Sequence, residues 1–75
     1  MIDKDIVAQY DVYAYDDSET IHDYIGNDLN EAIKSFETLK SIYTNKKEID
    51  SDATIVLYDN WNEKIVNDYN TLRDA

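Results

Sequence analysis

The segment from Asp28 to Tyr43, DLNEAIKSFETLKSIY, is the one stretch of this sequence whose apolar residues recur with a clear helical period. They stand three or four positions apart, which places them on one side of an α-helix. These residues are Leu29, Ala32, Ile33, Phe36, Leu39 and Tyr43, with Ile42 at the margin. We therefore expect an amphipathic helix whose apolar side packs on the rest of the chain.

The sequence also indicates where this helix begins. Asp28 is suited to cap it, because its carboxylate can accept hydrogen bonds from the first free amides while Glu31 reaches back to Asp28. Gly26 and Asn27 supply the turn that precedes the cap.

The chain before the helix has the pattern of a β-hairpin. Residues 6–15 alternate strictly, with Ile6, Ala8, Tyr10, Val12 and Ala14 on the expected core face. Short polar residues at 16–19 then predict a turn, and residues 20–25 predict a second strand.

The chain after the helix begins with ATIVLY at residues 53–58, which is apolar at nearly every position and predicts a central strand. Residues 64–69 fit a strand, but Ile65, Val66, Tyr69 and Leu72 would also line one face of a helix. An internal sequence similarity favours the strand. YDNWNEKIVNDY at 58–69 resembles YDDSETIHDY at 15–24, which belongs to the first predicted hairpin.

These patterns predict a single α+β domain over residues 1–75, with the order β-β-α-β-β. One helix would cover one face of a four-stranded antiparallel sheet whose strand order is 2-1-3-4. The alternative, with a helical last segment, is β-β-α-β-α.

Alternation places Tyr13, Tyr15, Val56 and Tyr58 on the sheet face opposite the helix. Such a face is either an ordinary half-exposed surface or an interface, since tyrosine is enriched where proteins bind. Trp61, in the predicted turn at 59–62, either folds back as a cap on the core or serves as an exposed anchor for a partner.

Charge restricts the partners. Seventeen acids stand against seven bases, for a net charge of -10, and there is no cysteine. Strong acidity repels nucleic acid and anionic membranes and favours basic protein surfaces. The cysteine-free composition and the absence of an apolar run of signal-peptide or membrane-span length favour a cytoplasmic protein. Frequent Asn, Ile, Lys and Tyr hint at a bacterial source with A/T-rich codons.

The sequence contains no recognisable catalytic or metal-binding motif. The single glycine, Gly26, does not fit a calcium loop, and His22 has no serine or cysteine nucleophile motif beside it. We expect no enzymatic activity, no metal and no cofactor.

Several acids stand two residues apart, a step of about 6.6 Å in an extended chain, which is close to the phosphate spacing of a nucleic-acid strand. The spaced acids include Asp17 with Glu19, and Glu48 with Asp50 and Asp52. The wider set of acids that could cover a nucleic-acid site is Asp16, Asp17, Glu19, Asp23, Glu48, Asp50, Asp52, Asp59 and Glu63. The alternative is that they only confer solubility.

In size, charge and composition the whole chain resembles the small inhibitors that phages and mobile elements make against host defences, such as anti-CRISPR proteins, anti-restriction DNA mimics and uracil-DNA glycosylase inhibitors. The resemblance implies stoichiometric binding to a basic groove of a nuclease or CRISPR-Cas complex inside a bacterial host cell. No sequence motif is shared, so no family residue is carried over.

Two functional hypotheses follow. In the first, the acids cover a nucleic-acid-binding groove of a host enzyme or ribonucleoprotein. In the second, the chain is a structural or adaptor domain that pairs with a partner, or with itself as a homodimer, through Tyr13, Tyr15, Tyr58 and Trp61.

Overall fold

The structure, a computed structural model, describes residues 7–44 and 52–71. One helix and four strands follow one another in the predicted order, with residues 64–69 in a strand and not in a helix. The elements are β1 (Tyr10–Tyr15), β2 (Thr20–Gly26), α1 (Leu29–Thr44), β3 (Thr54–Asp59) and β4 (Lys64–Asn70).

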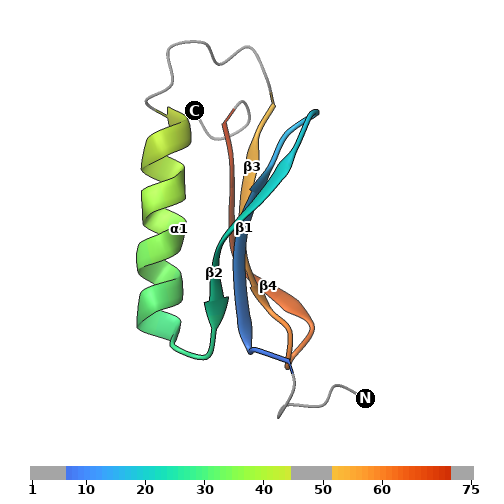
Figure 1. Cartoon of the computed structure of the whole chain (residues 1–75), viewed down its shortest axis with the longest axis vertical. Coiled ribbons are helices and arrows are strands. Elements are labelled where there is room, and N and C mark those ends of the chain that lie inside the picture. Colours follow the sequence, from blue (N-terminus) through green and yellow to red (C-terminus); the bar gives the residue numbers. More distant parts are fainter. Residues whose placement is uncertain (1–6, 45–51, 72–75) are drawn as a thin grey trace.

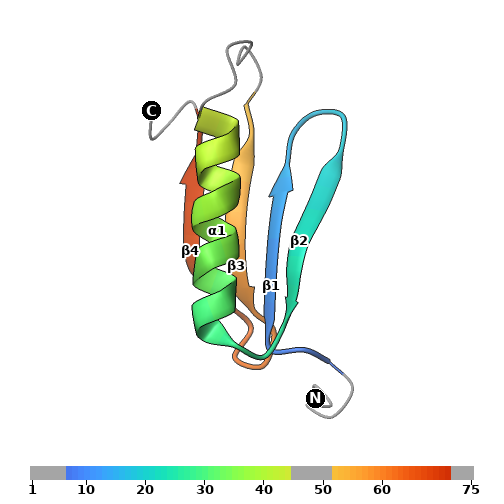
Figure 2. The same ribbon diagram turned by 60° about the vertical axis from the view of Figure 1, so that its left-hand side comes forward.

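The strands form one sheet in the order β2-β1-β3-β4, and each neighbouring pair is antiparallel. Figure 1 shows α1 on one side of this sheet, and Figure 2 shows the strands side by side behind the helix. The two most apolar strands, β1 and β3, are central, which confirms the predicted strand order.

The core lies between α1 and the two central strands. The alternation in β1 and β3 turns every second side chain toward the helix, as the sequence predicts. The buried apolar cluster consists of Val12, Ala14, Ala32, Phe36, Leu39, Tyr43, Ala53, Ile55 and Leu57, with Tyr10, Tyr24 and Tyr69 packed against it.

The buried side of α1 is narrower than its apolar pattern predicts. Leu29 and Ile33 are 41% and 44% exposed, so the expectation that they share the buried side is wrong; Ile42, expected at the margin, is 50% exposed. The stripe that contacts the sheet includes Phe36 and Leu39. Apolar residues to either side of this stripe face past the small sheet, because one straight helix presents only a limited arc of its surface to a flat layer.

The start of α1 follows the predicted cap in part. Asp28 Oδ1 accepts from the Asn30 amide at 2.9 Å and from the Glu31 amide at 3.3 Å. The Asp28 amide, however, donates to the Tyr24 hydroxyl at 3.0 Å, and the Glu31 carboxylate lies 3.7 Å from Lys34 Nζ. The predicted reach of Glu31 back to Asp28 is therefore replaced by a tyrosine from β2.

Gly26 is required by this arrangement. A Cβ atom at Gly26 would lie 2.5 Å from the Tyr24 hydroxyl oxygen, which is too close for any ordinary contact. The lack of a side chain therefore lets Tyr24 fold over the turn and meet the first turn of α1.

The first strand is shorter than predicted, because β1 begins at Tyr10 and residues 7–9 are not in a strand. The carbonyl groups of Val7 and Ala8 accept instead from Trp61 Nε1 at 2.8 Å and Asn60 Nδ2 at 3.2 Å. These bonds hold the segment against the β3–β4 turn.

Candidate binding surface

The sheet face turned away from α1 has no element over it among the residues that the structure describes. The register of the strands arranges its side chains in three rows, each with one residue from β2, β1, β3 and β4 in turn. The rows are Ile25-Asp11-Tyr58-Ile65, His22-Tyr13-Val56-Asp68 and Thr20-Tyr15-Thr54-Asn70. We call this set the open sheet face; it carries Tyr13, Tyr15, Val56 and Tyr58, as the alternation predicts.

The middle of the open sheet face is aromatic. The Tyr13 ring centroid lies 6.2 Å from that of Tyr15, with 29° between the planes, and 5.5 Å from the His22 ring. Val56 is only 4% exposed although it lies on this face, so the side chains around it cover it. Tyr15 at the end of β1 is 42% exposed and presents its ring to solvent.

The neighbours of Tyr13 also change the pKa of its hydroxyl. Burial raises the pKa of the Tyr13 hydroxyl above 10.0, and the charges of Asp11, Tyr15 and Tyr58 raise it further. All three lie on the open sheet face, so the ring of Tyr13 is at the centre of a tyrosine and carboxylate cluster.

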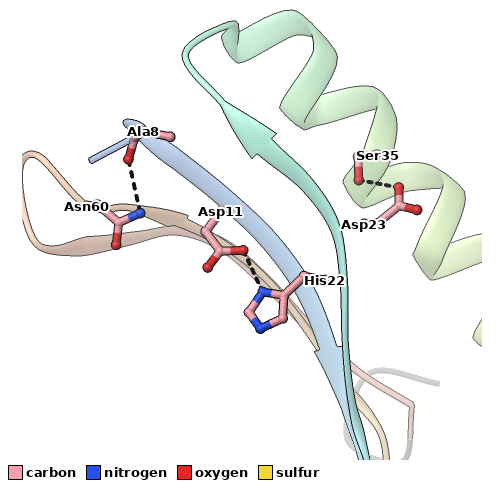
Figure 3. A network of polar contacts seen from close by, with 6 residues as sticks. All are labelled: Ala8, Asp11, His22, Asp23, Ser35 and Asn60. Atoms are coloured by element: carbon pink, nitrogen blue, oxygen red, sulfur yellow. Dashed lines mark hydrogen bonds and ion pairs between the residues drawn. The ribbon is translucent and has the colours of Figure 1, made fainter. Parts of the chain in front are cut away.

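Asp11 and His22 form a polar contact on this face, as Figure 3 shows. His22 Nδ1 lies 2.9 Å from Asp11 Oδ1, and because a carboxylate only accepts, the ring nitrogen donates. Asp11 Oδ2 has no hydrogen-bond donor among the described residues. The pair therefore holds one carboxylate oxygen, and the charge of this carboxylate acts on the nearby Tyr13 hydroxyl.

The predicted acids of the β1–β2 turn differ in role. Asp16 Oδ1 accepts from the Ser18 amide at 2.8 Å, the Ser18 hydroxyl at 2.9 Å and the Glu19 amide at 2.9 Å, so this carboxylate shapes the turn. Asp17 and Glu19 are exposed. Within residues 7–44 and 52–71 their carboxylates form no hydrogen bond or ion pair.

The predicted acids of the β3–β4 turn lie at the other end of the central strands. Asp59 is 4% exposed; its Oδ1 accepts from the Trp61 amide at 3.0 Å and the Asn62 amide at 3.1 Å. Its Oδ2 accepts from Asn62 Nδ2 at 2.7 Å and from Gln9 Nε2 at 3.5 Å. Asp59 is thus enclosed in its own turn, whereas Glu63 is exposed and adopts a positive φ of 52°.

The pKa of Asp59 follows from this enclosure. Burial by itself would raise it, but hydrogen bonds from Asn62, Gln9 and Trp61 outweigh burial and hold the pKa below 3.8. The carboxylate is therefore ionised at neutral pH, and hydrogen-bond donors stabilise its charge.

Trp61 folds back onto the segment before β1, and it is not among the described residues that pack against the buried apolar cluster. Its ring nitrogen donates to the Val7 carbonyl at 2.8 Å, and the side chain is half-buried. It lies in the β3–β4 turn, outside the rows of the open sheet face.

The remaining predicted acids either form hydrogen bonds within the fold or lie outside the described part of the chain. Asp23 lies at a bulge in β2 opposite Val12 and accepts from the Ser35 hydroxyl of α1 at 2.5 Å (Figure 3). Asp52 accepts from Asn70 Nδ2. Glu48 and Asp50 lie outside the described residues.

Charge is distributed unevenly over the described residues. Their bases are Lys34 and Lys40 on α1 and Lys64 at the first position of β4. Lys34 lies near Glu31, and Lys40 Nζ lies 4.9 Å from the centroid of the Tyr69 ring. None of the twelve positions of the open sheet face, three rows of four, is Lys or Arg, whereas Asp11 and Asp68 are both acidic.

Sequence reasoning missed His22 and Asp68 as members of this surface and left Asp11 out of the predicted contact residues. Alternation along β1 already joins Asp11 to Tyr13, so that signal was available. The positions of His22 and Asp68 depend on bulges in β2 and β4, which shift the register between Val12 and Tyr13 and between Leu57 and Tyr58.

Over the part of the chain that the structure describes, no three His, Cys, Asp or Glu side chains are grouped closely enough to hold a metal ion. The helix at 29–44 is neither long nor apolar enough to cross a membrane. Comparison with protein-family models, with curated proteins and with solved structures found no match.

Proposed function

We propose that this chain is a stoichiometric, non-catalytic inhibitor that binds the basic nucleic-acid-binding groove of a host nuclease or CRISPR-Cas complex as an acidic mimic. The supporting observation is that the open sheet face carries acids and no Lys or Arg. Asp11 and Asp68 lie on this face, Asp17 and Glu19 extend from the turn beside it, and the described lysines are at 34 and 40 on the helix and at 64 at the start of β4, outside the face.

The proposed contact uses the acids whose carboxylates remain available. Asp17 and Glu19 are two residues apart in an exposed turn, which is the spacing that motivates phosphate mimicry. In this proposal Asp16 and Asp59 stabilise the turns and do not contact the partner, since each carboxylate accepts hydrogen bonds from the amides of its own turn. Cationic grooves that bind nucleic acid attract such a surface over a long range at low salt.

The test uses the whole chain immobilised and exposed to a bacterial lysate at low salt. We expect retained proteins to be released by added duplex DNA or guide-like RNA, because nucleic acid and the chain would occupy the same groove. Raising the salt from about 0.05 M to about 0.5 M should also release them, since it shortens the screening length severalfold. Retention that neither nucleic acid nor salt reduces would contradict the proposal.

Charge reversal provides the matched variants. Asp17→Lys with Glu19→Lys changes the turn beside the open sheet face, and Glu31→Lys with Glu37→Lys makes the same change of charge on α1. We expect the turn variant to lose retention and the helix variant to keep most of it. Equal losses would show that net charge alone, and not this surface, governs binding.

A second candidate is a structural or adaptor domain that pairs through the open sheet face, including with a second copy of itself. Ile25, Tyr15 and Ile65, exposed by 63%, 42% and 55%, favour it because they place apolar surface on one face. Sedimentation equilibrium tests self-pairing: a dimer that persists at high salt and is lost in Tyr13→Ala supports it. A monomer at all concentrations contradicts it.

A further inference from the structure

The tyrosines at the centre of the open sheet face are not needed for the acidic character of the protein. The carboxylates of the exposed turns are enough to attract a cationic surface, so the aromatic rings suggest an additional contact. Here Asp11 lies opposite Tyr58 and two residues before Tyr13 on the same face, and its charge acts on the Tyr13 hydroxyl. A planar aromatic ring beside a carboxylate oxygen is the arrangement that suits a guanidinium group.

We propose that the open sheet face binds an arginine side chain of the basic partner, with the guanidinium stacked on the ring of Tyr13 and hydrogen-bonded to Asp11. This inference rests on the proposed function and names the contact that would anchor it.

The Asp11–His22 contact prepares the carboxylate for this role. His22 Nδ1 holds Oδ1 at 2.9 Å and fixes the orientation of the group, while Oδ2 has no donor within the described residues. The Asp11 side chain is 23% exposed, so an incoming donor would reach it from the surface without opening the fold. A charge-assisted hydrogen bond at this depth is partly shielded from water and salt.

The aromatic part selects arginine over lysine. The Tyr13 ring has two ring neighbours, Tyr15 along β1 and His22 on β2, with centroids 6.2 Å and 5.5 Å away. Arginine stacks on such a surface and can still direct its N–H groups sideways to a carboxylate, whereas the compact, strongly hydrated lysine ammonium loses more hydration for one contact. A second copy of this chain is a poor occupant, because Asp11 and Asp68 would meet acids of the same sign.

The test compares two peptides of equal charge and length, one alternating glycine with arginine and one alternating glycine with lysine. Binding to the full chain is followed by two-dimensional NMR at low and moderate salt. We expect the arginine peptide to bind about threefold more tightly or better, with the largest shifts at Tyr13, His22 and Asp11. Equal affinities, or shifts confined to the turns or α1, would overturn the inference.

Two ring variants separate stacking from folding. Tyr13→Phe keeps an aromatic ring and should keep the arginine preference, whereas Tyr13→Leu keeps an apolar strand residue and should remove it. Asp11→Asn should weaken the arginine peptide more than Glu37→Gln, which removes one charge from α1. Preference retained in Tyr13→Leu, with the variant folded, would overturn the inference.

The outcomes also separate this inference from the proposed function. Equal, salt-sensitive binding of both peptides leaves the acidic inhibitor standing and removes arginine selection. If neither peptide binds at low salt, both proposals fail. Self-association of the free chain through Tyr13 would assign the face to a second copy and overturn the arginine site.

Discussion

Asp16 and Asp59 make the same backbone hydrogen bonds in the two hairpins. Each follows a tyrosine at the end of a central strand, and the Oδ1 of each accepts from the amides two and three residues further on. The resemblance between residues 15–24 and 58–69 is therefore structural, since it repeats the element that turns the chain. Asp59 is more buried than Asp16, so we expect the two carboxylates to contribute differently to the free energy of unfolding.

That difference predicts unequal effects on stability. Asp59→Ala should lower the free energy of unfolding by about 2 kcal/mol, because it leaves several partly buried donors without an acceptor, whereas Asp16→Ala should cost about 1 kcal/mol. Urea unfolding followed by circular dichroism measures both. Equal losses would mean that enclosure of Asp59 adds nothing to its turn.

Asp59 also predicts a pH dependence. Its pKa in the folded chain lies below 3.8, and a carboxyl with a lowered pKa stabilises the fold above its unfolded pKa and loses that contribution as pH falls through the folded value. The difference in unfolding free energy between the wild type and Asp59→Asn should therefore be full at about pH 6 and should shrink between about pH 4 and pH 2. A difference that stays constant over this range would contradict the assigned pKa.

Glu63 is held in the left-handed region, with φ at 52°, inside the β3–β4 turn. Glycine adopts this conformation without the strain of a side chain but loses more chain entropy on folding. Glu63→Gly should raise the free energy of unfolding by about 0.5–1 kcal/mol, and Glu63→Ala, which keeps a Cβ atom, should change it little. Thermal unfolding of both variants is the measurement; a destabilised Gly variant would disagree with this backbone conformation.

Leu39 and Leu29 offer a matched pair on one helix. Leu39 is 4% exposed in the core, and Leu29 is 41% exposed at the start of α1. Leu39→Ala should cost about 2–4 kcal/mol of unfolding free energy and Leu29→Ala less than about 1 kcal/mol, because only the first opens a cavity. Similar costs from urea unfolding would indicate that α1 buries the broader side that its sequence pattern predicts.

The fold was largely predictable because its signals are local. Alternation in β1, the apolar run of β3 and the period of α1 each follow from a few neighbouring residues, and the repeated Tyr-Asp turns resolve the fourth strand. The exposure of Leu29 and Ile33 was not predictable, since it depends on how much of the helix a four-stranded sheet can cover.

The candidate surface was predictable only in part. Alternation places Tyr13 and Tyr58 on one face, but the contact between Asp11 and His22 requires the register of two strands and a bulge opposite Val12. The burial of Asp59 likewise depends on Gln9, fifty residues earlier in the chain. Acids that look alike in the sequence thus divide into turn-closing and available groups only in three dimensions.

The most direct test of the central proposal is a competition titration. It uses a purified partner that the immobilised chain retains from a lysate and that added DNA releases. The fraction of labelled nucleic acid bound to that partner is measured by fluorescence anisotropy as the chain is added. Binding should fall to zero at one equivalent of the chain per groove, and the Asp17→Lys, Glu19→Lys variant should require a large excess. A ternary complex, in which the chain and nucleic acid bind the partner together, would contradict the account.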